Sequence, residues 1–155
     1  AMSISDRVVV MRNGQIEQVG TPEDIYAKPL TRFVADFVGK VNFIPVSIVE
    51  SGQEETSVEI FGRQMTIPKV SYSSGETHLA VVRPEELRLM PPDNGFVHGE
   101  VTSRTYLGSV VEYDLALSDG LTLMAIEYNP KAKPPFEIGD VAGVYFDLDK
   151  LHLLK

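Results

Sequence analysis

The 155-residue sequence contains no cysteine, no tryptophan and no apolar run near the ~20 residues that a membrane-spanning helix needs. Without cysteine, disulfides, thiolate catalysis and cysteine metal sites are excluded, which suits a reducing cytosol. Basic residues are also scarce, since 14 lysines and arginines face 22 acidic residues and leave a net charge of −8. This charge repels phosphate backbones and anionic headgroups, so it weighs against general binding to nucleic acid or membrane surfaces.

The sequence also lacks the motifs that usually carry chemistry. The phosphate-binding pattern G-x-x-x-x-G-K-[ST] is absent, and no G-x-S-x-G turn presents a serine nucleophile. His78, His98 and His152 show none of the paired spacings of metal ligands. The neighbouring carboxylates Glu85 and Glu86 are interpreted as solvated surface. We therefore expect no catalytic residue, no metal site and no bound cofactor in this chain.

The first forty residues predict a hairpin followed by two short helices. Strand-like runs at 7–11 and 15–19 flank Asn13-Gly14, the dipeptide most typical of a two-residue hairpin turn. Thr21 followed by Pro22 predicts the capped start of one helix, and Thr31 predicts the start of a second.

From residue 41 onward the sequence predicts short strands and no long helix. In the run 110–117, Val111, Tyr113 and Leu115 alternate with Glu112 and Asp114, the pattern of a half-buried antiparallel strand. We therefore expect a mainly β fold, either a small barrel or two linked barrel-like sheets. The predicted strands are 46–50, 57–61, 64–68, 78–83, 86–90, 99–107, 110–117, 121–128, 141–146 and 151–154.

The same alternation predicts which side chains form the core, and the proline-rich stretch 129–140 is expected to be a loop. The expected core positions are Val46, Ile48, Val58, Ile60, Leu79, Val81, Val111, Tyr113, Leu115, Leu123, Val144 and Phe146.

Two groups of motifs resemble one known protein family. DRVVVMRNGQIEQVG (6–20) and TPEDIYAKPLTRFVADFVG (21–39) closely resemble the C-terminal end of the nucleotide-binding domain of ABC importer ATPases. VNFIPVSIV (41–49), VVRPEELRL (81–89) and YLGSVVEYDL (106–115) resemble the TOBE accessory domain that follows it in that family. The family's Arg-Pro-Glu signature is carried by Arg83, Pro84 and Glu85, and its turn by Gly108. Val82 departs from the glycine or isoleucine that often precedes this signature.

The resemblance implies an OB-like TOBE barrel or sandwich, at 41–155, behind a 1–40 tail of the nucleotide-binding domain. It implies a parent ATPase that uses ATP and magnesium, whose catalytic motifs lie upstream, so this fragment is expected not to be an enzyme. The expected role is regulation and dimerisation of an importer subunit, in the cytoplasm at the inner face of the plasma membrane. The expected partners are a second copy, permease subunits and a regulatory protein, and not nucleic acid.

The signature residues are expected to be structural. Pro84 lacks an N–H donor and should end the preceding strand. Arg83 is expected to pair with a nearby carboxylate and to fix the turn.

Two alternatives stay open. One is a sensor for a small ligand, an oxyanion or sugar, for which the candidate donors are Arg63, Arg83, Arg88 and Arg104. The other is an oligonucleotide-binding barrel, which rests on fold analogy alone and which the acidic balance opposes.

Residues 1–40 carry many apolar side chains, which this short segment does not cover by itself. An isolated hairpin is marginal in water, and an exposed strand edge can pair with another chain. We expect residues 1–40 either to be disordered or to be buried against a second copy, and we favour a homodimer joined through 6–20. The candidate side chains for self-association are Val8, Val9, Val10, Ile16, Phe33 and Phe37.

Overall fold

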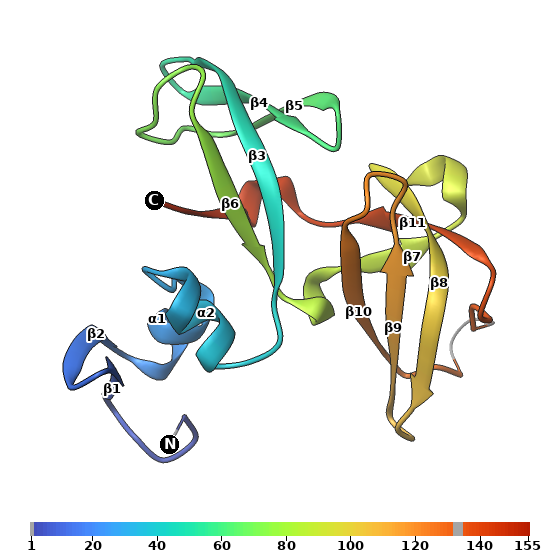
Figure 1. The fold of residues 1–155 in the computed structure, drawn as a ribbon, viewed down its shortest axis with the longest axis horizontal. Helices are drawn as coiled ribbons and strands as arrows, with labels where there is room; N and C mark the ends of the chain where they lie inside the picture. The colour runs from blue at the N-terminus through green and yellow to red at the C-terminus, as the bar shows by residue number, and fades with distance from the viewer. Residues whose placement is uncertain (1, 132–134) are drawn as a thin grey trace.

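The computed structural model describes residues 2–131 and 135–155, so part of the loop predicted at 129–140 lies outside the described residues. Figure 1 shows three parts: an N-terminal hairpin with two helices, a first sheet above it, and a second, curled sheet beside the first. In the ranges that the structure describes, no helix is long and apolar enough to cross a membrane.

The N-terminal part forms as its turn and cap residues predict. Asn13 and Gly14 have φ of 50° and 77°, the left-handed conformations that the tight turn requires. The hydroxyls of Thr21 and Thr31 each accept the backbone N–H three residues on, both at 3.2 Å, so both predicted caps are confirmed. The elements are β1 (Val8–Arg12), β2 (Gln15–Gly20), α1 (Pro22–Ala27) and α2 (Arg32–Phe37).

The first sheet is antiparallel, with strand order β12-β6-β3-β4-β5. Its strands are β3 (Asn42–Ser51), β4 (Glu55–Ile60), β5 (Arg63–Pro68), β6 (Thr77–Val82) and β12 (His152–Leu154). The strand predicted at 46–50 begins four residues earlier, at Asn42, because β3 pairs with β6 from that residue onward. The final strand of the chain therefore returns to the sheet that the first strands of the β-rich part began.

The second sheet is also antiparallel, with strand order β10-β9-β8-β11-β7. Its strands are β7 (Arg88–Met90), β8 (Val97–Tyr106), β9 (Val110–Ala116), β10 (Thr122–Tyr128) and β11 (Val141–Tyr145). Gly108 has φ of 83° in the turn between β8 and β9. Three 3₁₀ turns complete the chain: η1 (Pro84–Glu86), η2 (Pro92–Asn94) and η3 (Leu148–Lys150). The chain crosses between the sheets twice, through η1 on the way out and through η3 on the way back.

One hydrophobic core joins the two sheets, which resolves the expected choice in favour of two linked sheets. It contains Tyr113 and Leu115 of β9 together with Ile44 of β3, all essentially inaccessible to solvent. All the predicted core positions are buried except Leu79, which is half-buried. The mainly β fold is confirmed, and a strand lies in each predicted range, although the one predicted at 86–90 begins only at Arg88 because Glu86 belongs to η1.

The N-terminal part has a small cluster of its own. Val10 is buried there against Ile25 and Val34, within the same chain. By contrast, Ile16 and Phe37 are 63% and 67% exposed. The remaining candidates for self-association are half-buried or exposed: Val8, Val9 and Phe33. Self-association itself stays a prediction, but Val10 is not free to take part in it.

The helices also pack on the first sheet. Ala35 of α2 is buried against Val81 of β6 and Leu154 of β12, and the Arg32 guanidinium lies 4.7 Å from the centre of the Phe43 ring. The expectation that residues 1–40 have only two possible fates, disorder or a second copy, is therefore wrong. The helices instead cover the outer surface of the chain's own first sheet.

Replacing Leu115 with alanine tests the shared core. Leu115 is fully buried, so the lost contacts and the cavity should lower the free energy of unfolding by about 2–5 kcal/mol. Leu107→Ala is the control, because Leu107 is 55% exposed and its loss should cost less than about 0.5 kcal/mol. Urea denaturation followed by circular dichroism measures both, and equal effects would contradict a core centred on β9.

Candidate functional site at the Arg83 junction

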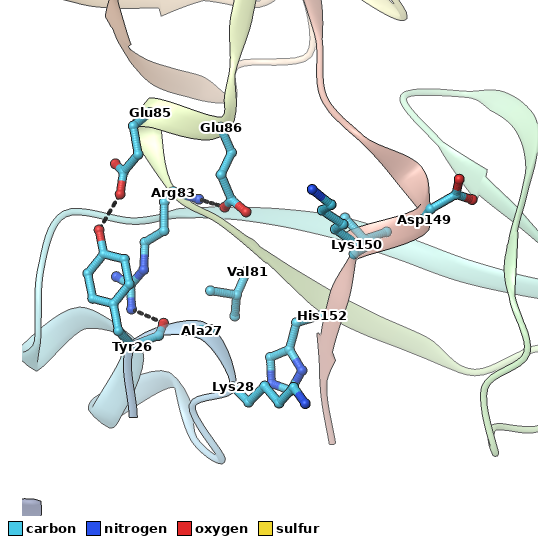
Figure 2. A pocket seen from close by; sticks show the side chains of 11 residues that line it. Tyr26, Ala27, Lys28, Val81, Arg83, Glu85, Glu86, Asp149, Lys150 and His152 are labelled. Atoms are coloured by element: carbon cyan, nitrogen blue, oxygen red, sulfur yellow. Dashed lines mark hydrogen bonds between the residues drawn. The ribbon is translucent and has the colours of Figure 1, made fainter. Parts of the chain in front are cut away.

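The Arg-Pro-Glu signature lies where the chain leaves the first sheet. β6 ends at Val82, and Pro84 begins η1 because proline has no N–H to continue the strand pairing. Arg83 stands between them, and only 3% of it is exposed. Figure 2 shows its side chain running back toward the helices of the N-terminal part.

The Arg83 guanidinium binds backbone carbonyls rather than a carboxylate. Its Nη1 donates to the carbonyl oxygens of Ala35, Gly39 and Lys40 at 2.8, 3.2 and 3.2 Å. Its Nη2 donates to the carbonyl oxygen of Tyr26 at 2.9 Å. These carbonyls lie at the ends of α1 and α2, where helices leave acceptors without internal partners. The expected carboxylate partner is wrong, because no ion pair to Arg83 occurs within 2–131 and 135–155.

The carboxylates of Glu85 and Glu86 also support the junction, each by accepting a hydrogen bond. The Tyr26 ring lies 4.2 Å below the Arg83 guanidinium, and its hydroxyl donates to Oε1 of Glu85. Oε2 of Glu86 accepts the backbone N–H of Arg83 at 2.6 Å. Burial, and next the hydrogen bond to Glu85, raise the pKa of Tyr26 to about 12. The interpretation of this carboxylate pair as merely solvated surface is wrong.

The connection between α1 and α2 is held from two sides. Gln18 of β2 donates from Nε2 to the carbonyl of Lys28 at 3.1 Å and accepts the N–H of Leu30 at 2.8 Å. His152 of β12 lies 2.8 Å from the carbonyl oxygen of Pro29 through Nε2, which must carry the proton because a carbonyl can only accept. The last strand of the chain thus binds the N-terminal part directly.

The linker after α2 is the segment 39–42, whose last residue, Asn42, begins β3. It is fixed against the second sheet. The side-chain amide of Asn42 donates to the Met124 carbonyl at 2.8 Å and accepts the Met124 N–H at 2.7 Å. It therefore pairs with the outer edge of β10 as a strand residue would. Lys40 Nζ lies 2.9 Å from the Glu112 carboxylate on β9. The linker is held by Arg83 on one side and by the second sheet on the other.

A pocket of about 510 Å³ opens beside this junction (Figure 2). It lies between the end of α1 and the two crossings η1 and η3. Its lining comprises Tyr26, Ala27, Lys28, Val81, Arg83, Glu85, Glu86, Asp149, Lys150, Leu151 and His152. Across the described part of the chain, no group of histidines and carboxylates is arranged to hold a metal ion.

The four arginines considered as ligand donors do not converge. Arg83 is occupied by the helix ends, and Arg63 Nη1 donates to two backbone carbonyls just before β8 at 3.2–3.3 Å. Arg104 lies 3.4 Å from Glu137 on the second sheet. Arg88 borders a second hollow near the junction, and Arg83 borders the pocket itself. The geometry gives no observation in favour of a barrel site built from all four.

Several junction residues were not predicted from the sequence. Asn42 offered a signal, since it occupies the same alternating face as the buried Ile44 and Val46 and should have been recognised as an inward polar side chain. Gln18 offered none, because it is buried in the hairpin although Ile16, two residues before it on the same strand, is 63% exposed. Tyr26 offered none, because its contacts come from residues more than fifty positions away.

Arg83→Lys tests the junction. A single ammonium cannot reach the carbonyls of both helices, so at least one hydrogen bond from a charged donor, worth about 1.5–3 kcal/mol, should be lost. Amide hydrogen exchange in α1 and α2 should become about ten- to a hundredfold faster, while exchange in β9 stays unchanged. Arg63→Lys is the control, because that side chain contacts carbonyls outside the helices. Unchanged exchange in α1 and α2 would contradict the role of Arg83.

Tyr26→Phe tests the contact with Glu85. With a folded pKa near 12 against about 10 in the unfolded chain, Tyr26 keeps its proton when folded but loses it when unfolded, so its contribution to stability is full below pH ~10 and is lost toward pH ~12. Burial also raises the pKa of Tyr113. Titration at 295 nm should therefore show late ionisation of Tyr26 and Tyr113, and the contribution of Tyr26 should be missing from the variant.

Tyr106→Phe is the matched control, because Tyr106 is exposed and its loss should leave the late ionisation of Tyr26 unchanged. Far-ultraviolet circular dichroism on the same samples separates ionisation from unfolding. An undiminished late step in Tyr26→Phe would show that the hydroxyl is not held by Glu85.

The chain is similar to one domain family and to several curated proteins. The TOBE domain family matches residues 80–154. All of the chain aligns at 35% identity with the spermidine/putrescine import ATP-binding protein PotA of Ruegeria pomeroyi, covering 43% of that protein. The protein of the same name from Acetivibrio thermocellus is 36% identical over 156 residues, with 100% of this chain and 41% of that protein covered. The namesake from Marinobacter nauticus is 36% identical over 141 residues, which are 88% of this chain and 38% of that protein.

One solved structure shares the fold. The cytoplasmic molybdate-binding protein ModG, with molybdate bound, superposes with a TM-score of 0.57 over 74% of this chain and 94% of its own, at 19% identity. Identity this low supports a likeness of fold alone. The chain spans about two fifths of the length of the curated relatives that it matches. Residues 80–154 therefore match the TOBE domain family, and the chain as a whole is similar to part of the ATP-binding subunits of importers.

Proposed function

We propose that this chain is the regulatory and dimerising part of an importer ATP-binding subunit and has no catalytic role of its own. The observation that carries the proposal is the buried Arg83, which ties the helices of the N-terminal part to the TOBE body through four carbonyl oxygens. That N-terminal part resembles the end of a nucleotide-binding domain. A displacement of one part therefore acts directly on the other.

The strength of the junction supports transmission rather than loose tethering. Units within one chain move relative to each other unless the contact between them is large or tightly bonded. Here buried hydrogen bonds from a charged group combine with apolar contact between Ala35 and Val81. His152 adds a bond from the last strand to Pro29. The parts are therefore expected to move as one body.

Exposed apolar side chains support the dimerising role. Ile16 and Phe37 are open on the N-terminal part, and Tyr106 and Tyr128 are open at one end of the second sheet. Such surfaces suit an interface between copies of the same chain. Tyr106 and Tyr128 lie on the TOBE body, so they would serve an interface between two copies that does not use the hairpin.

The relatives' names suggest the wider setting. Because these relatives are named as import proteins for spermidine and putrescine, we propose a polyamine importer as the setting. ATP and magnesium would bind the nucleotide-binding part of the longer protein, and permease subunits and a regulatory protein would be its partners. The chain would then act in the cytoplasm at the inner face of the membrane.

A chimera tests this proposal. It joins the ATP-binding part of the Ruegeria pomeroyi relative to residues 1–155, which replace the matching stretch, and a matched version stops after Gly39. Without the TOBE body, dimerisation measured by sedimentation should weaken at least about tenfold, a loss of about 1.4 kcal/mol. The dependence of ATP hydrolysis on protein concentration should shift with it.

The isolated chain supplies the control. Titration of residues 1–155 with labelled ATP and magnesium should give a flat trace. Micromolar binding, or a truncated chimera that dimerises as tightly as the complete one, would contradict the proposal.

A further inference from the structure

The pocket beside Arg83 is formed by the two crossings between the sheets. It adjoins a second hollow of about 320 Å³, and both are bordered by Val81, Glu85, Glu86 and Lys150. The volume of the first is within the range of sites for small organic ligands. Of the residues shared by both hollows, Lys150 is the cation, and its side chain is exposed.

The pocket offers an apolar surface. Val81 of β6 and Leu151, just before β12, are both part of its lining, together with Ala27 at the end of α1. A ligand with an apolar body would remove this surface from water. An inorganic ion would not, so the lining favours an organic ligand.

The formal charges of the lining cancel, so their arrangement decides which ligand charge is favoured. Glu85 already accepts the Tyr26 hydroxyl, and Glu86 already accepts the Arg83 N–H. Figure 2 shows the Asp149 carboxylate directed away from the pocket. The acidic groups are therefore either engaged in hydrogen bonds or turned outward.

Arg83 is bonded to the helix ends, but the two lysines of the lining are not engaged in the same way. Among the described residues, no ion pair or hydrogen bond joins the ammonium groups of Lys28 and Lys150 to a partner. The same is true of the Arg88 guanidinium, which borders the adjoining hollow beside Lys150. An incoming anion would thus meet free cations and bonded carboxylates, although the chain as a whole is acidic.

We propose that this pocket binds a small organic anion, with its apolar body against Val81 and Leu151 and its charged group facing Lys150. The proposal goes beyond the regulatory role and does not require it, because it rests on the pocket alone. A bound anion would contact α1, β6 and the segment before β12 at once. It would therefore strengthen the junction that Arg83 forms.

Three probes with one apolar body test the charge preference. The whole chain, labelled with ¹⁵N, is titrated with 4-phenylbutyrate, 4-phenylbutanol and 4-phenylbutylamine, and with inorganic phosphate. Phenylbutyrate should produce saturable amide shifts at Ala27, Val81 and Leu151. The alcohol should bind more weakly, and the amine and phosphate should leave these amides unchanged.

Substitutions then locate the charged group. Lys150→Gln should weaken phenylbutyrate binding about fivefold, the loss of about 1 kcal/mol for a partly exposed charge contact. Glu86→Gln should strengthen it, because the amide oxygen can still accept the Arg83 N–H while the negative charge is gone. Lys69→Gln is the control, since Lys69 is outside both hollows.

Three outcomes would overturn the proposal. The first is the absence of saturable shifts with phenylbutyrate at millimolar concentration. The second is equal or tighter binding of the amine, which would show that the carboxylates govern the pocket. The third is a loss of affinity in Lys150→Gln that Lys69→Gln reproduces, which would mean that only the overall charge matters.

Discussion

The buried guanidinium of Arg83 is the interaction on which the arrangement of the parts depends. Moving a charge out of water is costly unless hydrogen bonds replace its hydration. Here four carbonyl oxygens and the face of Tyr26 do so. The planar, forked donor set of arginine can reach two helix ends at once, which a point charge cannot. The Ala35 carbonyl gains as well, since without Arg83 it would be a buried acceptor without a partner.

The first crossing between the sheets begins at the same position in the chain. Pro84 ends β6 immediately after Arg83, so the chain must leave the first sheet where the arginine is anchored. On the far side, Asn42 attaches the linker to β10 by imitating a strand residue. Both sheets and both helices are therefore linked through one short segment, 39–42. The two sheets and the helical part are consequently held together at this one segment.

Local chemistry explains what could be predicted from the sequence. Asn13-Gly14, the threonine caps and the alternation in 110–117 act within a few residues, and the structure confirms each of them. The partner of Arg83 could not be predicted in this way, because Ala35 lies 48 residues away in the chain. The choice of a carboxylate partner followed the commonest pairing for arginine. It overlooked that helix ends also present acceptors, and that two of them were adjacent.

The junction also limits what any bound molecule could do. A ligand shifts a conformational balance only by the difference between its affinities for the two states. A molecule between α1 and η3 touches groups on both sides of the junction, so its affinity must depend on whether Arg83 is seated. By reciprocity, whatever loosens Arg83 from the helix ends must weaken that molecule's binding by the same factor. The fold therefore makes the neighbourhood of Arg83 the place where binding and the arrangement of the parts are coupled.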